Sequence, residues 1–237
     1  MMDMEKYMTP RLLCITSFAE KGCKVADIGT DHAYIPIWLV AHSIAESAIA
    51  MDIKEGPLRR ADDNIKKFSL ESRISTRLSN GLEKLVAGEV DTVVIAGMGG
   101  ILINEILEAG KHLGDSVGRY ILQPMTAVEE TRKYLAENGF CIENEKLAQE
   151  EDKIYCVLSV ARGNMKIDKK IGYYVGEKLI EQKDPLLIAY LNGKIYEYEK
   201  AIASLLLSDK SKTAEKLAHF TYLSCEMKKI REECMAW

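Results

Sequence analysis

The sequence has few of the residues that build metal centres and no segment typical of secreted or membrane-spanning chains. Its six cysteines are scattered, without a CxxC pair and without metal-ligand spacing to the four histidines, so we expect reduced thiols and no metal site. No stretch resembles a signal peptide or an apolar run of about 18 residues. We therefore expect a cytoplasmic protein that does not insert into a membrane.

The chain also lacks the positive charge typical of proteins that bind nucleic acid without selectivity. Its 237 residues carry a formal net charge of −4, but residues 1–161 are acidic and residues 162–237 are mildly basic. The basic tail fits either a solvated helical surface or contacts to phosphates. With 47% apolar residues, the chain can bury one medium domain and carry an appendage.

Strand-like and helix-like segments alternate up to residue 122, which predicts right-handed crossovers and a parallel sheet. Two further strands around a polar turn predict an antiparallel hairpin at the sheet edge. The seven expected strands are Lys24–Ile28, Ser47–Ile53, Ile74–Leu78, Thr92–Ala96, Arg119–Leu122, Cys141–Leu147 and Ile154–Ala161. We expect an α/β fold whose Rossmann-like sheet of seven strands resembles that of class I methyltransferases.

Turn residues mark several expected helix boundaries. Thr9-Pro10 predicts an N-cap followed by proline at the first helical position. Gly56-Pro57 predicts a break before a helix that carries Arg59 and Arg60, for which a solvated surface is the default position.

Beyond residue 162 the sequence is typical of helices. We expect a first helix over about Lys169–Gln182 and a longer one with Pro185 in its first turn. Two apolar stripes step by threes and fours on either side of a polar turn at about Ser208–Lys212, which predicts an antiparallel coiled coil. The stripes are Leu187, Leu191, Ile195, Tyr198, Ile202 and Leu205, and Leu217, Phe220, Leu223, Met227 and Ile230. We therefore expect a catalytic domain over residues 1–162 and a helical domain over residues 163–237.

The segment KVADIGTDHAYIP, residues 24–36, is the most informative of the chain. Asp27 falls near the carboxyl end of a buried strand, and Gly29 lets the backbone approach a ligand closely. The three-glycine dinucleotide fingerprint is absent, and Asp27 and Asp31 would repel a pyrophosphate. They suit a cationic nucleoside cofactor such as S-adenosylmethionine, although an ordinary strand-to-helix turn with Asp31 near the N-cap remains an alternative.

Two later strand ends extend this cofactor hypothesis. Asp52 closes the second strand, where a carboxylate can accept hydrogen bonds from both ribose hydroxyls. Asn80 precedes Gly81 after the third strand, where its amide can read the adenine edge, or where the pair can form a simple tight turn.

The fourth and fifth strands end in residues that leave space for a flat substrate. Gly97, Met98, Gly99 and Gly100 let backbone line the pocket opposite the transferred methyl group. In the segment 123–125, Gln123 and Pro124 are candidates for substrate contact, whereas Met125 is better explained by packing.

Six blocks, in this order and at these intervals, resemble the bacterial tRNA (adenine-N1)-methyltransferases that modify adenine 22. They are ADIGTDHAYIP, GPLRRADDN, SNGLEKL, VVIAGMGGILINEIL, LQPM and EDKIYCVL. The resemblance covers residues 9 to about 161 and implies a class I fold, S-adenosylmethionine as methyl donor, a coiled-coil C-terminal domain and tRNA as substrate. The sequence departs from the family at Asn80, where the family carries Asp, and at Met125, where it carries Asn, so a direct polar role for Met125 is in doubt.

The expected site combines these residues. Adenine N1 has an exposed lone pair, so orientation should matter more than activation of a nucleophile, and we expect Asp31 to be catalytic by holding the N6 amine. Cofactor contacts are expected from Asp27, Gly29, His32, Asp52, Asn80, Gly81, Gly97, Met98 and Gly99, and substrate contacts from Tyr34, Gly100, Gln123 and Pro124.

The predicted function is thus methyl transfer to adenine 22 of tRNA by a monomer. The alternatives are a methyltransferase acting on a small molecule or a protein, and a non-catalytic RNA-binding scaffold.

Overall fold

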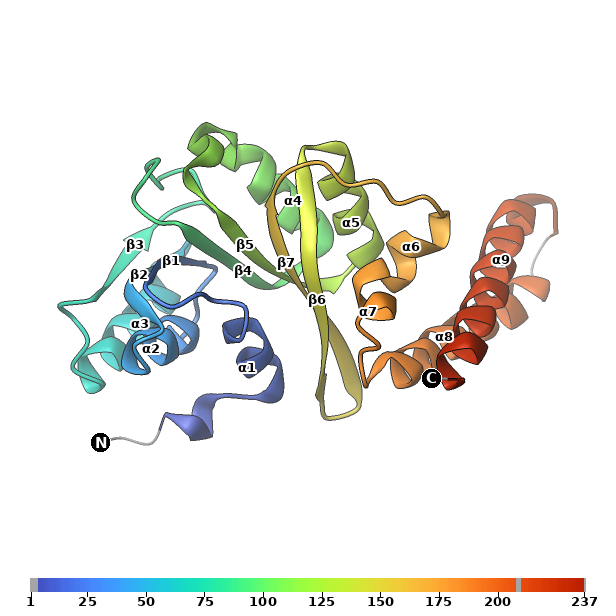
Figure 1. Cartoon of the computed structure of the whole chain (residues 1–237), viewed down its shortest axis with the longest axis horizontal. Helices are drawn as coiled ribbons and strands as arrows, with labels where there is room; N and C mark the ends of the chain where they lie inside the picture. Colours follow the sequence, from blue (N-terminus) through green and yellow to red (C-terminus); the bar gives the residue numbers. More distant parts are fainter. Residues whose placement is uncertain (1–3, 208–209, 237) are drawn as a thin grey trace. The chain divides into compact units, whose positions relative to one another are not determined.

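The computed structural model describes residues 4–207 and 210–236. The chain divides into two compact units, Met1–Lys166 and Ile167–Trp237. Both units are drawn in Figure 1, and each is described by itself below.

The first unit is built on one seven-stranded sheet with the order β3-β2-β1-β4-β5-β7-β6. Strands β1 to β5 run parallel, and β7 pairs antiparallel with β5 and β6. The strands are β1 (Cys23–Ile28), β2 (Ala45–Asp52), β3 (Ile74–Leu78), β4 (Thr92–Gly99), β5 (Arg119–Thr126), β6 (Phe140–Glu150) and β7 (Lys153–Arg162). The predicted α/β class, the seven strands and the reversed final hairpin are confirmed.

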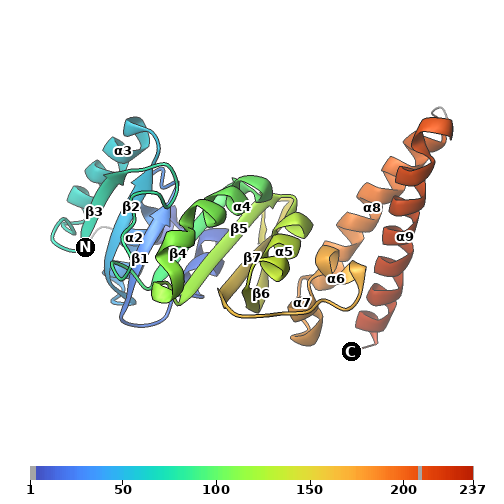
Figure 2. The ribbon, with the colours of Figure 1, turned by 90° about the horizontal axis from the view of Figure 1, so that it is seen from above.

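Helices cover both faces of this sheet. Figures 1 and 2 place α1, α2 and α3 on one face and α4 and α5 on the other. They are α1 (Pro10–Thr16), α2 (Tyr34–Ala41), α3 (Glu55–Lys67), α4 (Gly100–Ala109) and α5 (Val128–Glu137), with short 3-10 helices η1 (Glu5–Tyr7) and η2 (Gly110–Ser116). Because both faces are covered, the central strands are almost continuously apolar and buried.

The observed helix ends confirm one of the boundaries predicted from turn residues and contradict another. Thr9 caps α1, accepting a hydrogen bond from the Leu12 amide at 3.4 Å, with Pro10 in the first helical position as predicted. The break expected at Gly56-Pro57 is wrong, because α3 already begins at Glu55. Proline is tolerated there since amides in the first turn have no partner within the helix.

A buried ion pair ties α5 to the terminal hairpin. Arg132 Nε donates to Glu145 Oε1 at 2.7 Å, and the two side chains are 0% and 1% exposed. Arg132 Nη2 also donates to Cys156 Sγ at 3.3 Å. Burial raises the pKa of the Cys156 thiol to about 12, so this cysteine is an inert packing group.

The second unit begins with two short helices instead of the single helix expected over Lys169–Gln182. Helices α6 (Lys170–Val175) and α7 (Glu177–Glu181) meet at Gly176, whose φ of +94° cannot continue a helix. The prediction for Pro185 is also wrong, because α8 (Leu187–Leu206) begins two residues later. Asp184 Oδ1 accepts from the Leu186 amide at 2.8 Å and forms the turn before it.

Helices α8 and α9 (Lys210–Met235) pack side by side in opposite directions, as Figure 2 shows. Lys228 pairs with Glu199 at 2.6 Å, and Arg231 donates to Asn192 at 3.0 Å, so the register runs antiparallel. All residues of the two predicted stripes are buried or half-buried. The expected turn at 208–212 falls partly on residues 208–209, which lie outside the described residues, and α9 has already begun at its later end. Coiled-coil geometry stays a prediction.

Candidate functional site

The carboxyl ends of five parallel strands meet at one edge of the sheet, and most predicted site residues lie there. Asp27 pairs in register with Ala50 of β2 and Val94 of β4. Asp52 is the last residue of β2, Asn80 follows β3, and Gln123 lies in β5 beside Ala96 of β4. This edge is where ligands bind in open α/β sheets.

The turn after β1 is formed by two amides that bond to the neighbouring strand. Gly29 and Thr30 both donate to the Met51 carbonyl, at 2.8 and 2.9 Å. Gly29 has a φ of +76°, and a Cβ there would lie 2.0 Å from Met98 Cε. Glycine is therefore required both by the backbone conformation and by the close approach of the β4 loop.

Asp27 is the buried acid of the site. It is 5% exposed, and desolvation raises its pKa to about 6, with a smaller upward contribution from the charge of Asp52. The nearby Thr30 hydroxyl offsets part of the rise, without a hydrogen bond of normal geometry. Within residues 4–207 and 213–236 no lysine or arginine pairs with Asp27.

Asp31 is an exposed carboxylate held between two side chains. Arg60 Nε donates to Asp31 Oδ1 at 3.1 Å, the second Arg60 nitrogen also donates to it, and His32 Nε2 lies 3.3 Å from Asp31 Oδ2. The Asp31 and Arg60 side chains are 60% and 50% exposed. The helix N-cap is Ala33, so Asp31 does not cap α2. No local pattern linked Arg60 to Asp31, because 29 residues separate them.

Tyr34 is already sandwiched in a stack of rings. The His32 ring lies 5.1 Å from it at an interplanar angle of 8°, and the Tyr7 ring lies 5.0 Å away at 21°. Lys67 donates to the Tyr7 hydroxyl at 3.2 Å. A target base could stack on Tyr34 only by displacing one of these rings, which weighs against the predicted substrate contact.

The ends of β2 and β3 form the neighbouring part of the edge. Asp52 Oδ1 accepts from the Lys54 amide at 2.7 Å, which leaves Oδ2 free of a hydrogen bond in the described part of the chain. Asn80 is exposed and donates to Glu83 at 2.7 Å. Gly81 has a φ of +54° and packs against Ile106, so the Asn80-Gly81 pair forms a tight turn and leaves the amide at the surface.

The glycines at the end of β4 and the start of α4 differ from one another. Gly97 has a φ of +75° and open space where a Cβ would lie. A Cβ on Gly99 would lie 3.3 Å from Thr126 Oγ1, and one on Gly100 would lie 2.4 Å from the Ala127 carbonyl. Gly97 thus borders open space, whereas Gly100 is buried and allows α4 and α5 to pack closely, which weighs against the substrate role predicted for Gly100.

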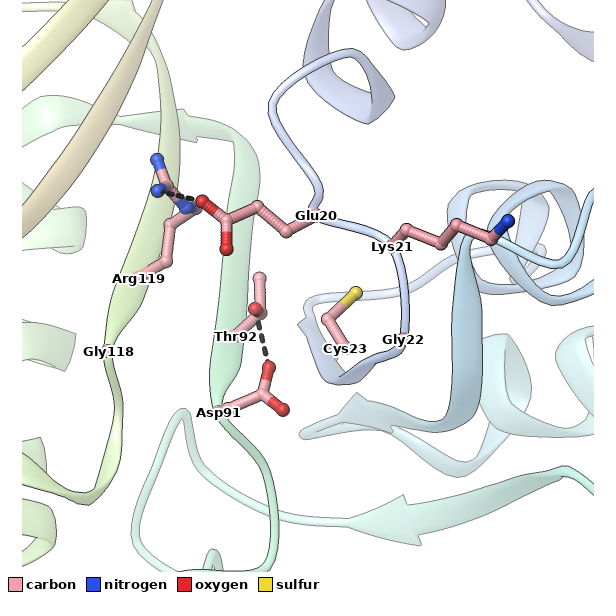
Figure 3. Close-up of a pocket in the computed structure, with 8 residues that line it drawn as sticks. All are labelled: Glu20, Lys21, Gly22, Cys23, Asp91, Thr92, Gly118 and Arg119. Carbon is pink, nitrogen blue, oxygen red and sulfur yellow. Dashed lines mark hydrogen bonds and ion pairs between the residues drawn. The ribbon is translucent and has the colours of Figure 1, made fainter.

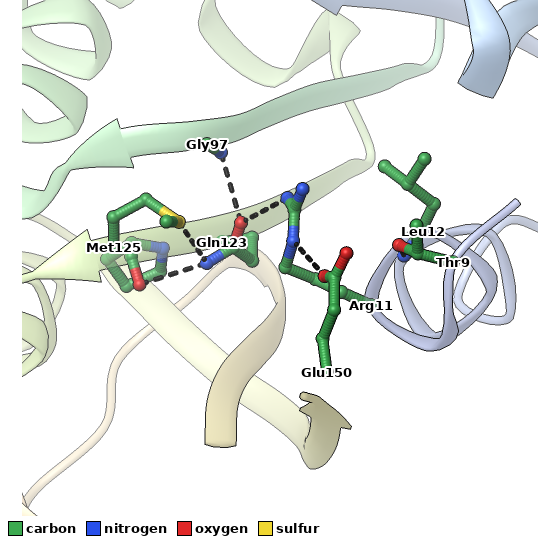
Figure 4. A network of polar contacts seen from close by, with 8 residues as sticks. Thr9, Arg11, Leu12, Gly97, Gln123, Met125 and Glu150 are labelled. Carbon is green, nitrogen blue, oxygen red and sulfur yellow. Dashed lines mark hydrogen bonds and ion pairs between the residues drawn. The ribbon is translucent and has the colours of Figure 1, made fainter. Parts of the chain in front are cut away.

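Gln123 is fully buried, and its polar atoms bond within the protein. Its Oε1 accepts from Arg11 Nη1 at 2.9 Å and from the Gly97 amide at 3.1 Å, and its Nε2 donates to the Pro124 carbonyl at 3.1 Å (Figure 4). These hydrogen bonds hold the segment around Gly97 in place. They weigh against the direct substrate contact that was predicted for Gln123 and Pro124. Arg11 was missed because nothing in its neighbourhood signals a contact 112 residues away.

These residues fit a cationic nucleoside cofactor. Asp27 lacks a cation, Asp52 keeps one carboxylate oxygen available, and the Thr30 hydroxyl is a buried polar atom without a hydrogen-bond partner in the described chain. An ammonium group near Asp27 would restore its ionisation.

Cavities at the opposite edge of the sheet have a different character. One of about 270 Å³ lies at the amino ends of β1, β4 and β5 (Figure 3). Its Arg119 pairs with Glu20 at 2.5 Å, and its Asp91 accepts from the Lys24 amide and from Thr92 Oγ1. Because these charged groups already have partners, we assign no ligand to it.

The described residues hold neither a membrane-spanning helix nor a cluster of metal ligands. No helix among them is long and apolar enough to cross a membrane, and no group of three or more His, Cys, Asp or Glu side chains among them is arranged to hold a metal ion.

Comparisons with known proteins agree with this geometry. The methyltransferase-domain family matches residues 8–158. The tRNA (adenine(22)-N(1))-methyltransferase of Bacillus subtilis is 36% identical over 189 residues, which are 78% of this chain and 79% of that protein.

Two solved structures carry the cofactor or its product. One, from Streptococcus pneumoniae in complex with S-adenosyl-L-methionine, has a TM-score of 0.85 and 32% identity, covering 94% of this chain and 99% of that one. M. capricolum TrmK in complex with S-adenosyl-homocysteine has a TM-score of 0.78 and 29% identity, covering 96% and 97%. The conserved methyltransferase fold, the acids at the carboxyl edge and this likeness along most of both chains show that the protein belongs to the tRNA (adenine(22)-N(1))-methyltransferase family.

Proposed function

We propose that this protein transfers a methyl group from S-adenosylmethionine to N1 of adenine 22 in tRNA. The observation that carries the proposal is the 36% identity to the Bacillus subtilis enzyme across 78% of this chain, together with the three acids Asp27, Asp31 and Asp52 at the carboxyl edge. We further propose that it acts as a monomer in the cytoplasm.

Each residue at the carboxyl edge of the sheet is proposed to contact a different part of the cofactor or the reacting groups. Asp27 would hold the cationic amino-acid end of the cofactor, the free oxygen of Asp52 would accept from a ribose hydroxyl, and the open backbone at Gly97 would border the reacting groups. When bound, S-adenosylmethionine supplies an electrophilic methyl group on a sulfonium, which suits the lone pair of neutral adenine N1.

Asp31 is proposed as the residue that positions the target base. Adenine needs no deprotonation at N1, so the enzyme's task is orientation and desolvation. Methylation leaves the base cationic, and a carboxylate at N6 would accept from the amine and stabilise the developing charge. An exposed ion pair contributes only about 0–1 kcal/mol, so Asp31 can exchange Arg60 for the base at small cost.

The helical unit is proposed to hold the tRNA while adenine 22 is exposed. N1 lies on the Watson–Crick edge, and flipping a base out of a stack costs a few kcal/mol, so contacts elsewhere on the RNA must keep it bound. The mildly basic residues 163–237 carry lysines that can contact phosphates. Deleting them should abolish tRNA methylation while leaving cofactor binding measurable; a truncated protein fully active on tRNA would refute this role.

The test of the function is a comparison of two unmodified tRNA transcripts that differ only at position 22. The purified protein is incubated with labelled S-adenosylmethionine and either the adenine-22 transcript or its guanine-22 counterpart. We expect label only in the first. Equal labelling of both would place the target elsewhere, and no label in either, with cofactor binding intact, would point to a small-molecule or protein substrate.

A further inference from the structure

Gly97 lies near the end of β4, in the segment called the β4 loop here, where the pairing with β5 becomes irregular. Strands β4 and β5 pair Ala96 with Gln123 and Met98 with Pro124, and the register shifts between them. Gly97 lies in this irregularity and has no paired residue in β5. The side chain of Gln123 accepts from the Gly97 amide at 3.1 Å.

The orientation of the Gln123 amide is fixed by two donors. Arg11 Nη1 at 2.9 Å and the Gly97 amide at 3.1 Å both point at Oε1. An inverted amide would place its NH₂ group against both, so the carbonyl must face them. Gln123 is 0% exposed, so in the intact protein its Oε1 depends on these two donors.

Arg11 in turn is fixed from three directions. It follows the Thr9 cap and Pro10 at the start of α1. Its Nε donates to Glu150 Oε2 at 2.9 Å, and its guanidinium lies 5.5 Å from the centre of the Tyr155 ring. Figure 4 shows the continuous series of contacts from Glu150 through Arg11 and Gln123 to Gly97. Helix α1, the terminal hairpin and the β4 loop are thereby joined by one guanidinium.

We propose that Arg11 is a positioning residue for the ligand site: acting through Gln123, it holds the bulged Gly97 loop in the conformation that binds the cofactor and admits the base. The inference rests on the proposed function, in which this loop borders the reacting groups. In this proposal Arg11 acts through Gln123 and has no direct contact with either ligand.

The mechanism predicts how single changes propagate. Arg11→Met keeps the length of the aliphatic stem and removes the charged donor, so Gln123 loses one of the two groups that fix its amide. The β4 loop should then open more often, and cofactor affinity or turnover should fall about tenfold, in line with the loss of one hydrogen bond to a charged group. Gln123→Glu keeps an acceptor for both donors but turns a carboxylate oxygen toward the Pro124 carbonyl that Nε2 contacted, so it should weaken binding moderately even when Arg11 is present.

The test uses the full-length protein and three readouts. Calorimetry measures the Kd of S-adenosylhomocysteine, steady-state assays separate kcat from KM for tRNA, and NMR measures hydrogen exchange at the Gly97 amide. For Arg11→Met we expect about tenfold weaker binding or slower turnover and about tenfold faster Gly97 exchange. Arg59→Met is the matched control, since Arg59 is 79% exposed and pairs only with Glu55 in the described structure; it should equal wild type in all three.

The combined variant tests the coupling between Arg11 and Gln123. Gln123→Glu in the Arg11→Met background leaves a buried carboxylate without its cation, so it should bind the cofactor far more weakly than the product of the two single effects. Additive effects would overturn the proposal, as would an Arg11→Met protein that melts earlier but keeps wild-type affinity, turnover and Gly97 exchange. Failure of the wild-type protein to bind S-adenosylhomocysteine would instead contradict the proposed function, and Gly97 exchange would still decide whether Arg11 orders the loop.

Discussion

Two arginine–carboxylate pairs in different regions of the molecule, one exposed and one buried, have opposite roles. At the carboxyl edge of the sheet, Arg60 and Asp31 are 50% and 60% exposed. Between α5 and the terminal hairpin, Arg132 and Glu145 are 0% and 1% exposed. The exposed pair is weak and can exchange partners, whereas the buried pair cannot lose one member without leaving an uncompensated charge. Burial, more than the identity of the residues, separates a ligand-binding group from a structural one.

The largest effect on folding should come from breaking the buried pair. Glu145→Ala removes the carboxylate that accepts from Arg132 Nε and should reduce the free energy of unfolding by about 3–5 kcal/mol. Urea denaturation followed by circular dichroism measures this. The double variant Arg132→Met/Glu145→Leu removes both charges and should recover most of the loss. If the free energy of unfolding of Glu145→Ala stays within about 1 kcal/mol of wild type, the buried pair contributes no more to stability than the exposed pair does, and the contrast between the two regions is wrong.

For the exposed pair we expect a large effect on turnover and a small effect on the free energy of unfolding. Asp31→Ala should lower turnover on tRNA about 100-fold, as for the loss of one group that stabilises developing charge. Its cofactor affinity should fall much less, and its unfolding free energy should change by less than about 1 kcal/mol. Single-turnover assays and calorimetry measure the first two quantities. Equal losses of affinity and turnover would reassign Asp31 to the cofactor.

Asp27 adds a buried carboxylate without a cation to the comparison. Its pKa is raised from 3.8 to about 6, so the fold favours the neutral carboxyl. This contribution to stability is present below pH 3.8 and is lost as the pH rises through 6. Binding of a cationic cofactor requires the ionised form, so affinity should rise up to tenfold per pH unit below about pH 6 and level off above it.

Asp27→Asn is the variant that isolates this titration. It should bind the cofactor weakly at every pH between 5 and 8, as judged by calorimetry, and it should be more stable than wild type above pH 6. A wild-type affinity that does not change across pH 6 would contradict the pairing of Asp27 with the cationic end of the cofactor.

The smallest effect should come from a pair with neither burial nor a ligand. Arg59 and Glu55 lie 3.0 Å apart at i,i+4 on α3, with side chains 79% and 69% exposed. Glu55→Ala should change the unfolding free energy by less than about 0.5 kcal/mol and leave turnover unchanged. A tenfold loss of turnover would show that this part of α3 also takes part in binding or catalysis.

The sequence carried enough information for the strands but not for the contacts between them. The seven strands and the Thr9 cap follow from local patterns of burial and turn chemistry, and the parallel arrangement then brings Asp27, Asp52 and the β4 glycines to one edge. Long-range partners such as Arg60 for Asp31 and Arg11 for Gln123 have no local signal. Gln123 illustrates the limit, since a buried amide and a substrate-binding amide have the same sequence context.

The helical unit shows the same limit at the level of the backbone. The two apolar stripes predicted the packed faces of α8 and α9. The break at Gly176 was not expected, because a single glycine within a helical pattern is usually tolerated.

The most direct test of the account is the chemical identity of the methylated nucleoside. Unmodified tRNA is treated with the protein and S-adenosylmethionine and then digested, and the product is identified and located by mass spectrometry. We predict N1-methyladenosine at position 22. A methyl group on N6, on another base, or on no nucleoside despite measurable cofactor binding would contradict it.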